Sequence, residues 1–128
     1  RREVKYGEGS RIDILLESGA QESPCFVEIK NVHLSRDPGL AEFPDSRTTR
    51  GAKHLAELAR MVATGARAVN LFVVQRSDCD RFRPAADLDP DYAKALADAQ
   101  RAGVELLCYD CAVTVHDVIL RQRIEVDL

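Results

Sequence analysis

The chain has 128 residues, of which 45% are hydrophobic and 30% charged, and its formal net charge is -3 at pH 7. This length supports one domain with a hydrophobic core and is too short for two. The negative net charge argues against attraction of nucleic acid over the whole surface, although a basic groove on one face is compatible with it. The longest strongly apolar run, around Leu71–Val74, is far shorter than the roughly 20 residues that cross a bilayer. We therefore expect a cytoplasmic protein without a membrane partner.

The cysteines do not indicate a disulfide scaffold. Four cysteines in a chain with this apolar content favour free thiols. Cys108 and Cys111 have the CxxC spacing, but a zinc site normally needs a second ligand pair, and the sequence holds no second CxxC or HxxxH. We expect both to be ordinary cysteines of a strand or turn.

The first part of the sequence predicts β-strands. Residues 3–6 favour a short strand, and residues 11–17 favour a second one after the turn-forming residues 7–10. A third strand over residues 25–34 would pair with the second as an antiparallel hairpin. The chain opens on Arg-Arg-Glu-Val without Met, so we also expect a fragment whose upstream part is missing. The residues expected on the core side of the second strand are Ile12, Ile14 and Leu16.

A long polar connection and a helix follow. Residues 35–47 contain Asp-Pro-Gly and Phe-Pro-Asp and predict a loop, and loops of this length are usually functional or mobile. Thr48 or Thr49 can cap the next helix, which has Gly65 as its stop. By helical spacing, its buried stripe is Leu55, Leu58, Ala59 and Val62.

The second half of the sequence predicts a strand, a helix and a strand. Residues 68–75 form a near-continuous apolar run, which is typical of a strand covered on both faces, and residues 77–89 predict a loop. Asp89 can cap a helix whose first position is Pro90 and which ends at Gly103. The expected inner stripe of this helix is Tyr92, Leu96 and Ala99.

The last part of the sequence completes the sheet. Residues 104–109 predict a buried strand that runs parallel to residues 68–75, with a right-handed connection. Residues 112–128 predict a hairpin that turns near His116 and Asp117. This order of elements predicts an α/β fold of the α+β kind, in which helices pack against a mixed sheet.

Two charged residues on one strand face mark a candidate site. Alternation along residues 25–32 places Glu28 and Lys30 side by side, which alone indicates a surface ion pair worth at most about 1 kcal/mol. The preceding strand adds Asp13, which the hairpin would bring next to them. Mg²⁺, with Mn²⁺ as the alternative, prefers oxygen ligands, so Asp13 and Glu28 are the predicted metal ligands. The metal would activate a water at a scissile phosphate, and Lys30 would orient that water or stabilise the transition state.

Beyond this cluster, several longer segments in a fixed order carry a more specific signal. They are Arg2–Val4, Gly9–Asp13, Val27–Val32, Phe43–Asp45, Thr48–Leu55, Arg81–Ala85 and Gly103–Glu105. The cluster resembles the site of the PD-(D/E)xK nuclease superfamily, and the segments resemble the sugar fermentation stimulation (SfsA) proteins over nearly the whole chain. The resemblance implies the C-terminal, restriction-endonuclease-like domain of that family over residues 1–128, and an upstream OB-like domain that is expected but absent from this chain.

The resemblance assigns expected roles to individual residues. Asp13, Glu28 and Lys30 match the catalytic positions of the superfamily. Glu3 is either an extra upstream acid of the catalytic site or the partner of Arg2 or Lys5 in a structural ion pair. The expected nucleic-acid-binding residues are Arg11, Arg50, Lys53 and His54, for which a turn end or a solvated helix face is the alternative.

The resemblance leaves two functions open. The family is described as DNA-binding without marked sequence specificity, which implies DNA, or alternatively RNA, as the partner. One function is magnesium-dependent hydrolysis of phosphodiesters by a metal-activated water. The alternative is a non-catalytic DNA-binding regulator of sugar (maltose) metabolism that keeps the nuclease fold.

Overall fold

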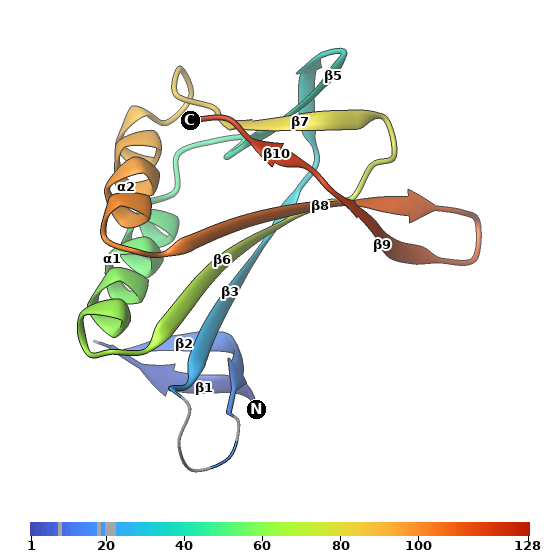
Figure 1. Cartoon of the computed structure of the whole chain (residues 1–128). Helices are drawn as coiled ribbons and strands as arrows, with labels where there is room; N and C mark the ends of the chain where they lie inside the picture. The colour runs from blue at the N-terminus through green and yellow to red at the C-terminus, as the bar shows by residue number, and fades with distance from the viewer. Residues whose placement is uncertain (8, 18, 20–22) are drawn as a thin grey trace.

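The computed structural model describes residues 1–7, 9–17, 19 and 23–128. Two helices and two sheets make up this part of the chain (Figure 1). Both helices lie against the same face of the larger sheet, and the smaller sheet lies beyond one end of its long central strands (Figure 1). The predicted α/β fold with a mixed sheet is confirmed.

The larger sheet has six strands in the order β1-β2-β3-β6-β8-β9. The three central strands β3, β6 and β8 run parallel, whereas β1, β2 and β9 are antiparallel to their neighbours. The predicted hairpin of the second and third strands and the parallel pairing of β6 with β8 are therefore confirmed. The turn of the last hairpin near His116 and Asp117 is also confirmed, but its first strand is the continuation of β8, and residues 125–126 pair in the smaller sheet instead. The strands are β1 (Arg2–Tyr6), β2 (Ser10–Leu16), β3 (Cys25–Val32), β6 (Arg67–Val74), β8 (Glu105–Val113) and β9 (Val118–Arg123).

The smaller sheet corrects two predictions. Residues 35–47 and 77–89 were expected to be loops, but they contain strands of a sheet with the order β10-β7-β5-β4. Strands β5 and β7 pair in parallel although they lie about forty residues apart in the sequence, so no local sequence pattern predicts this pairing. The Pro and Gly residues that indicated loops stand at strand ends and turns. The strands are β4 (Leu34–Asp37), β5 (Gly39–Phe43), β7 (Cys79–Pro84) and β10 (Glu125–Val126).

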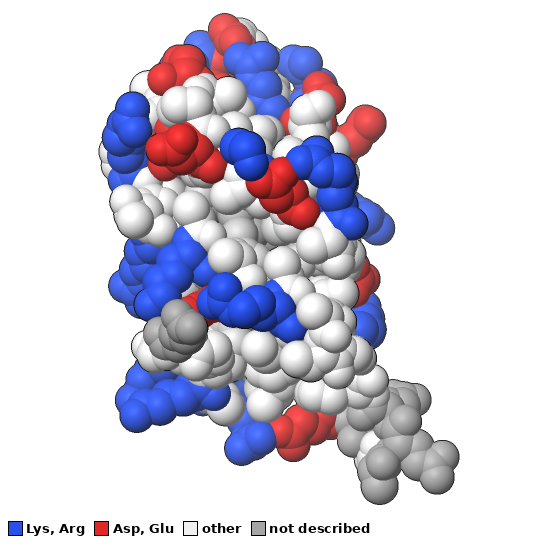
Figure 2. All heavy atoms as spheres, turned by 90° about the vertical axis from the view of Figure 1, so that its left-hand side faces the viewer, with Lys and Arg blue, Asp and Glu red and all other residues white. Residues whose placement is uncertain are grey.

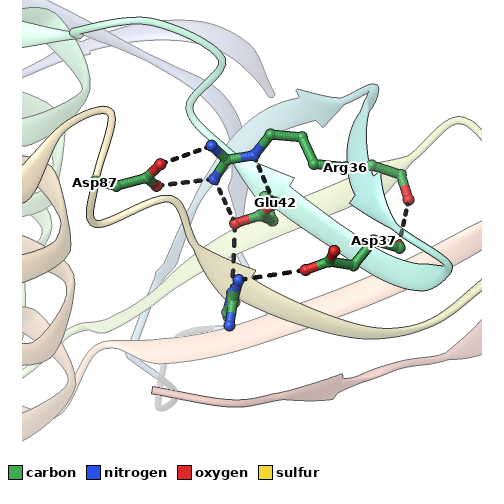
Figure 3. A network of polar contacts seen from close by, with 6 residues as sticks. Arg36, Asp37, Glu42 and Asp87 are labelled. Atoms are coloured by element: carbon green, nitrogen blue, oxygen red, sulfur yellow. Dashed lines mark hydrogen bonds and ion pairs between the residues drawn. The ribbon is translucent and has the colours of Figure 1, made fainter.

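A buried carboxylate holds the smaller sheet together (Figure 3). Glu42 of β5 is 1% exposed, and Arg36 of β4 donates to its two oxygens at 2.9 and 2.8 Å. Arg83 of β7 donates to the same carboxylate at 3.3 Å, while Arg36 also reaches Asp87 at 2.6 and 2.8 Å. The hydrogen bonds from Arg36 hold the pKa of Glu42 below its ordinary value despite burial. The network thus links β4, β5, β7 and the segment before the second helix.

The two helices begin at a shared carboxylate. Helix α1 (Thr49–Ala63) is capped by Thr48, whose hydroxyl accepts from the N–H of Gly51 at 3.0 Å. Helix α2 (Pro90–Arg101) is capped by Asp89, which accepts from Tyr92 at 3.0 Å and from the backbone N–H of Thr48 at 2.7 Å. Both predicted caps are confirmed. Within the described part of the chain, neither helix has the length and apolarity needed to span a membrane.

The core lies between the helices and the larger sheet. Phe72 of β6 stacks on Phe82 with ring centroids 4.3 Å apart, and Leu55, Leu58, Tyr92 and Leu96 pack in the same cluster. The opposite face of the sheet carries a smaller cluster around Val69, and neither helix of the described part of the chain covers it (Figure 1). The expectation that residues 68–75 are covered on both faces is therefore wrong for this chain. The four cysteines are buried free thiols.

Candidate functional site

Asp13 lies where strand β2 separates from β3. Pairing between these strands begins only at Ile14 and Val27. Beyond that point the carboxylate of Asp13 takes the place of a strand partner, because its Oδ2 accepts the backbone N–H of Ile29 at 2.7 Å. The side chain is thereby fixed against the strand that carries the other candidate residues.

The same irregularity corrects the predicted core face of β2. Ile12 and Leu15 are both buried in the main core, whereas Leu16 is 55% exposed and Ile14 packs on the opposite face of the sheet. Ile12 and Leu15 are three residues apart, which a regular alternation of two cannot place on one face. The strand therefore changes face around Asp13, and the alternation predicted from sequence ends there.

Glu28 is a buried acid at the centre of the site. It is 4% exposed, and its Oε1 lies 3.4 Å from Nζ of Lys30 and 2.9 Å from Nδ1 of His54. Among the described residues, no group forms a hydrogen bond with its Oε2. Burial raises the pKa of Glu28 to about 7, the charge of Lys30 opposes this rise, and Asp13 adds to it. Glu28 is thus a buried carboxyl group that favours its protonated form and has one oxygen without a hydrogen-bond partner among the described residues.

His54 brings helix α1 into contact with this acid. Its Nδ1 lies 3.0 Å from Nζ of Lys30 as well as 2.9 Å from Glu28. Burial and then the charge of Lys30 lower the pKa of His54, so the ring is neutral near pH 7. One ring nitrogen cannot donate to Glu28 and accept from Lys30 at once, so its tautomer decides which of the two contacts is a hydrogen bond. Lys30 and His54 together enclose the Oε1 side of Glu28.

Glu3 lies beside Asp13 in an unusual backbone conformation. Its φ is +53°, and it falls between the paired residues Arg2–Ile14 and Val4–Ile12, opposite Asp13. In the described part of the chain, it forms no ion pair with Arg2 or Lys5 within 4.0 Å. Glu3 and Asp13 line an open cavity of about 1140 Å³, whose other lining residues are Arg1, Arg2, Val4, Ile14, Ile29 and Asn31.

The predicted nucleic-acid-binding residues gather on the helix side of the site. Arg11, Arg50, Lys53 and His54 line a second cavity of about 330 Å³, together with Gly9 and Ser10. The charge of Arg50 adds a small lowering effect on the pKa of Glu28, after those of burial, Lys30 and Asp13, so the guanidinium acts on the buried acid through its charge. Figure 2 shows Lys and Arg side chains over the whole helix-covered face. Asp and Glu side chains are interspersed among them mainly on its upper part, and fewer lie on the lower part, where β1 and β2 lie in Figure 1.

The acids fit a divalent cation in part. Asp13 has a second oxygen beyond the one that accepts from Ile29, and Glu28 has its free Oε2. Mg²⁺ is commonly held by one or two carboxylates with water and phosphate oxygens in the remaining positions. Within the described ranges, no three His, Cys, Asp or Glu side chains converge on one point. Asp13 and Glu28 could therefore hold a cation only with help from water, a backbone carbonyl or a bound phosphate.

The sequence prediction missed two neighbours of Glu28. Tyr6 is 7% exposed, and burial, followed by Glu28, raises the pKa of its hydroxyl. Asn70 of β6 is fully buried and pairs with Glu28 in the sheet. The sequence does contain a signal for Asn70, because it is the one polar residue in the apolar run Ala68–Val74. The sequence contains no such signal for Tyr6, since an aromatic residue at the end of a strand is usually part of the hydrophobic core.

Fold and site together define a restriction-endonuclease-like α/β domain. A mixed sheet with helices on one face presents Asp13, Glu28 and Lys30 from two adjacent strands. The profile of the "Sugar fermentation stimulation protein RE domain" matches residues 1–117 of the chain. The chain belongs to the sugar fermentation stimulation protein family.

The chain is similar over its whole length to about half of each relative. It is 61% identical over 128 residues to the sugar fermentation stimulation protein homolog of Maricaulis maris and 55% identical over 128 residues to that of Paramagnetospirillum magneticum. The structure of Pyrococcus furiosus SfsA in complex with Ca²⁺ is similar with a TM-score of 0.90 at 32% identity, over 100% of this chain and 54% of that one. The chain spans 54% and 53% of the two relatives, about half of their length.

Proposed function

We propose that this chain is a nucleic-acid-binding domain that hydrolyses phosphodiesters with a divalent cation, Mg²⁺ or Mn²⁺, at Asp13 and Glu28. The observation that carries the proposal is the contact between Lys30 and buried Glu28 of β3 at 3.4 Å, next to Asp13 of β2, whose carboxylate accepts a hydrogen bond from the backbone N–H of Ile29 of β3. A cation there would lower the pKa of a bound water and neutralise charge on the phosphate. The solved structure of Pyrococcus furiosus SfsA in complex with Ca²⁺ supports a cation site of this kind.

The protein groups have separate tasks in this reaction. Lys30 is mostly buried, with 13% of its side chain exposed, so its charge acts at short range on an attacking water or on the developing charge of the phosphorane. Arg50 can hold the phosphate through paired N–H donors, and Lys53 can hold it as a point charge. Glu3 is proposed as an auxiliary acid, since it lines the same cavity as Asp13.

The substrate is proposed to be DNA, with RNA as the alternative. The basic residues Arg11, Arg50 and Lys53 lie around one cavity beside the acids, so a local basic surface exists on a chain of net charge -3. Because the chain spans about half of its relatives, we further propose that an OB-like domain joins it in the whole protein and extends the nucleic-acid contacts.

Cleavage assays test the catalytic part of the proposal. Linear and plasmid DNA are incubated with the protein in Mg²⁺ or Mn²⁺, and Asp13→Asn and Lys30→Ala should each reduce cleavage about 100-fold or more. Asp45→Asn and Lys94→Ala are matched controls, because both residues are exposed and neither lines the two cavities of the site, and they should cleave like the wild type. DNA binding without any cleavage would reject the nuclease and favour the non-catalytic regulator.

A further inference from the structure

Asn70 is a polar residue at a core position where the fold alone would favour an apolar side chain. It lies on the helix-covered face of β6 between Ala68, Phe72 and Val74, and all four residues are completely buried. Among the described residues, neither Oδ1 nor Nδ2 of Asn70 has a hydrogen-bond partner. A buried polar group without a partner destabilises the folded state, and an apolar side chain of similar size would avoid this cost.

The sheet register places this amide next to the buried acid. Asn70 pairs with Glu28 of β3 on one side and with Leu106 of β8 on the other. Neighbouring strands lie about 4.8 Å apart, and paired residues present their side chains on the same face. Oε2 of Glu28 also has no hydrogen-bond partner in the described part of the chain. The two groups are complementary, because an amide N–H donates and a carboxylate oxygen accepts.

A third polar group lies behind these two. Tyr92 of α2 is completely buried, and no described residue hydrogen-bonds to its hydroxyl. Burial raises the pKa of this hydroxyl, the Asn70 amide lowers it, and Glu28 raises it, so Tyr92 lies within electrostatic reach of both residues. Glu28, Asn70 and Tyr92 therefore form a row of polar side chains from the site into the core.

We infer that Asn70 is a positioning residue for Glu28. Neither side chain is hydrogen-bonded to the other in this structure, but a small rotation of either one lets the amide nitrogen of Asn70 donate to Oε2 of Glu28 and hold the carboxylate in one orientation, with Tyr92 behind the amide. This inference rests on the proposed function, because its consequence is a carboxylate prepared to bind a divalent cation. Residues that orient a metal-binding side chain are typically worth about 10–100-fold in metal affinity.

Calcium titration calorimetry on the cation-free protein tests this role. Asn70→Leu replaces the amide by an apolar group of similar size, so Ca²⁺ affinity should fall about tenfold or more while the thermal midpoint stays equal or rises. Tyr92→Phe should lower the affinity less, because it removes only the outer hydroxyl. Asn70→Ser retains a donor and should recover part of the affinity lost in Asn70→Leu.

Leu106→Ala is the matched control, since Leu106 is the other strand neighbour of Asn70. It should lower the thermal midpoint and leave Ca²⁺ affinity unchanged. Wild-type affinity in Asn70→Leu, or an equal loss in Leu106→Ala, would overturn the positioning role. Asp13→Asn separates the two proposals: if it leaves Ca²⁺ affinity unchanged, the cation site itself is wrong, and if it abolishes binding while Asn70→Leu does not weaken it, only the role of Asn70 is wrong.

Discussion

At the scale of single residues, the burial of Glu28 in the candidate site lowers the stability of the folded protein. A carboxyl group with 4% exposure and one unpaired oxygen prefers to be neutral, and its pKa rises to about 7 because burial outweighs the attraction of Lys30. Such a group is costly to ionise in the folded protein and becomes favourable only when a cation arrives. The neighbouring Asn70 carries a similar cost. We interpret this loss of stability as a consequence of the proposed cation site, which keeps polar groups buried for the ligand.

The titration of Glu28 predicts a pH dependence of stability. The folded state binds the proton more tightly than the unfolded chain, whose Glu titrates near 4.5. Its contribution to stability is therefore present below pH 4.5 and declines as the pH rises to about 7. Glu28→Gln should raise the free energy of unfolding of the cation-free protein at pH 8 by about 1–2 kcal/mol and leave it nearly unchanged at pH 4. Urea unfolding at both pH values measures this, and a destabilised variant at pH 8 would contradict it.

At the scale of secondary-structure elements, the smaller sheet depends on one charge network. Strands β4, β5 and β7 are short, and their Arg36, Glu42 and Arg83 side chains join them beneath a partly exposed surface (Figure 3). Both arginines keep contact with solvent, since 37% and 49% of their side chains are exposed, whereas Glu42 is 1% exposed. Removing the acid therefore leaves two cations that water can reach, and removing a base leaves a buried anion.

This asymmetry gives a prediction for Glu42. Glu42→Ala should destabilise the protein by about 2–3 kcal/mol, below the usual cost of breaking a fully buried pair because solvent screens the arginines. Its lowered pKa means that this contribution is present above the ordinary value of 4.5 and is lost as the pH falls through the folded pKa. Urea midpoints at pH 7 measure the effect. Glu105→Ala, which breaks the exposed pair with Arg67, is the control and should cost about 0.5 kcal/mol or less.

At the scale of the whole molecule, charge is distributed unevenly over an acidic chain. The net charge is -3, yet Arg11, Arg50 and Lys53 surround one cavity beside the candidate catalytic acids. Attraction to a polyanion is set by such a local surface within about one Debye length, roughly 8–10 Å at physiological salt. The proposed nucleic-acid ligand would thus be attracted to one end of the molecule and repelled elsewhere, which would orient the site towards the phosphates.

The salt dependence of DNA binding tests this arrangement. Each phosphate contact contributes about 0.9 to the slope of log K against log salt, so Arg50→Ala and Lys53→Ala should each lower the slope by about 1. Binding is measured by fluorescence anisotropy between 50 and 200 mM salt. Arg101→Ala is the control, because Arg101 lies in the last turn of α2, where it pairs with Asp98, and its slope should equal that of the wild type. Unchanged slopes in the Arg50 and Lys53 variants would rule out this surface.

The sequence alone determined the elements whose signals are local. Alternation predicted β2 and β3, capping residues predicted both helices at Thr48 and Asp89, and the spacing of Tyr92, Leu96 and Ala99 predicted the buried stripe of α2. Together with the family resemblance, it also singled out Asp13, Glu28 and Lys30. These residues come from adjacent strands, so local pairing suffices to bring them together.

The tertiary structure alone decided what depends on distant segments. The pairing of β5 with β7 joins residues that no local pattern links, and it turned two expected loops into a sheet. The change of face at Asp13 depends on where β2 leaves β3, and the contact of His54 with Glu28 depends on how α1 packs on the sheet. The burial that raises the pKa of Glu28, and the polar row behind it through Asn70, follow from the same packing. Sequence spacing fixes which residues share an element, whereas desolvation and contact between elements exist only once the chain is folded.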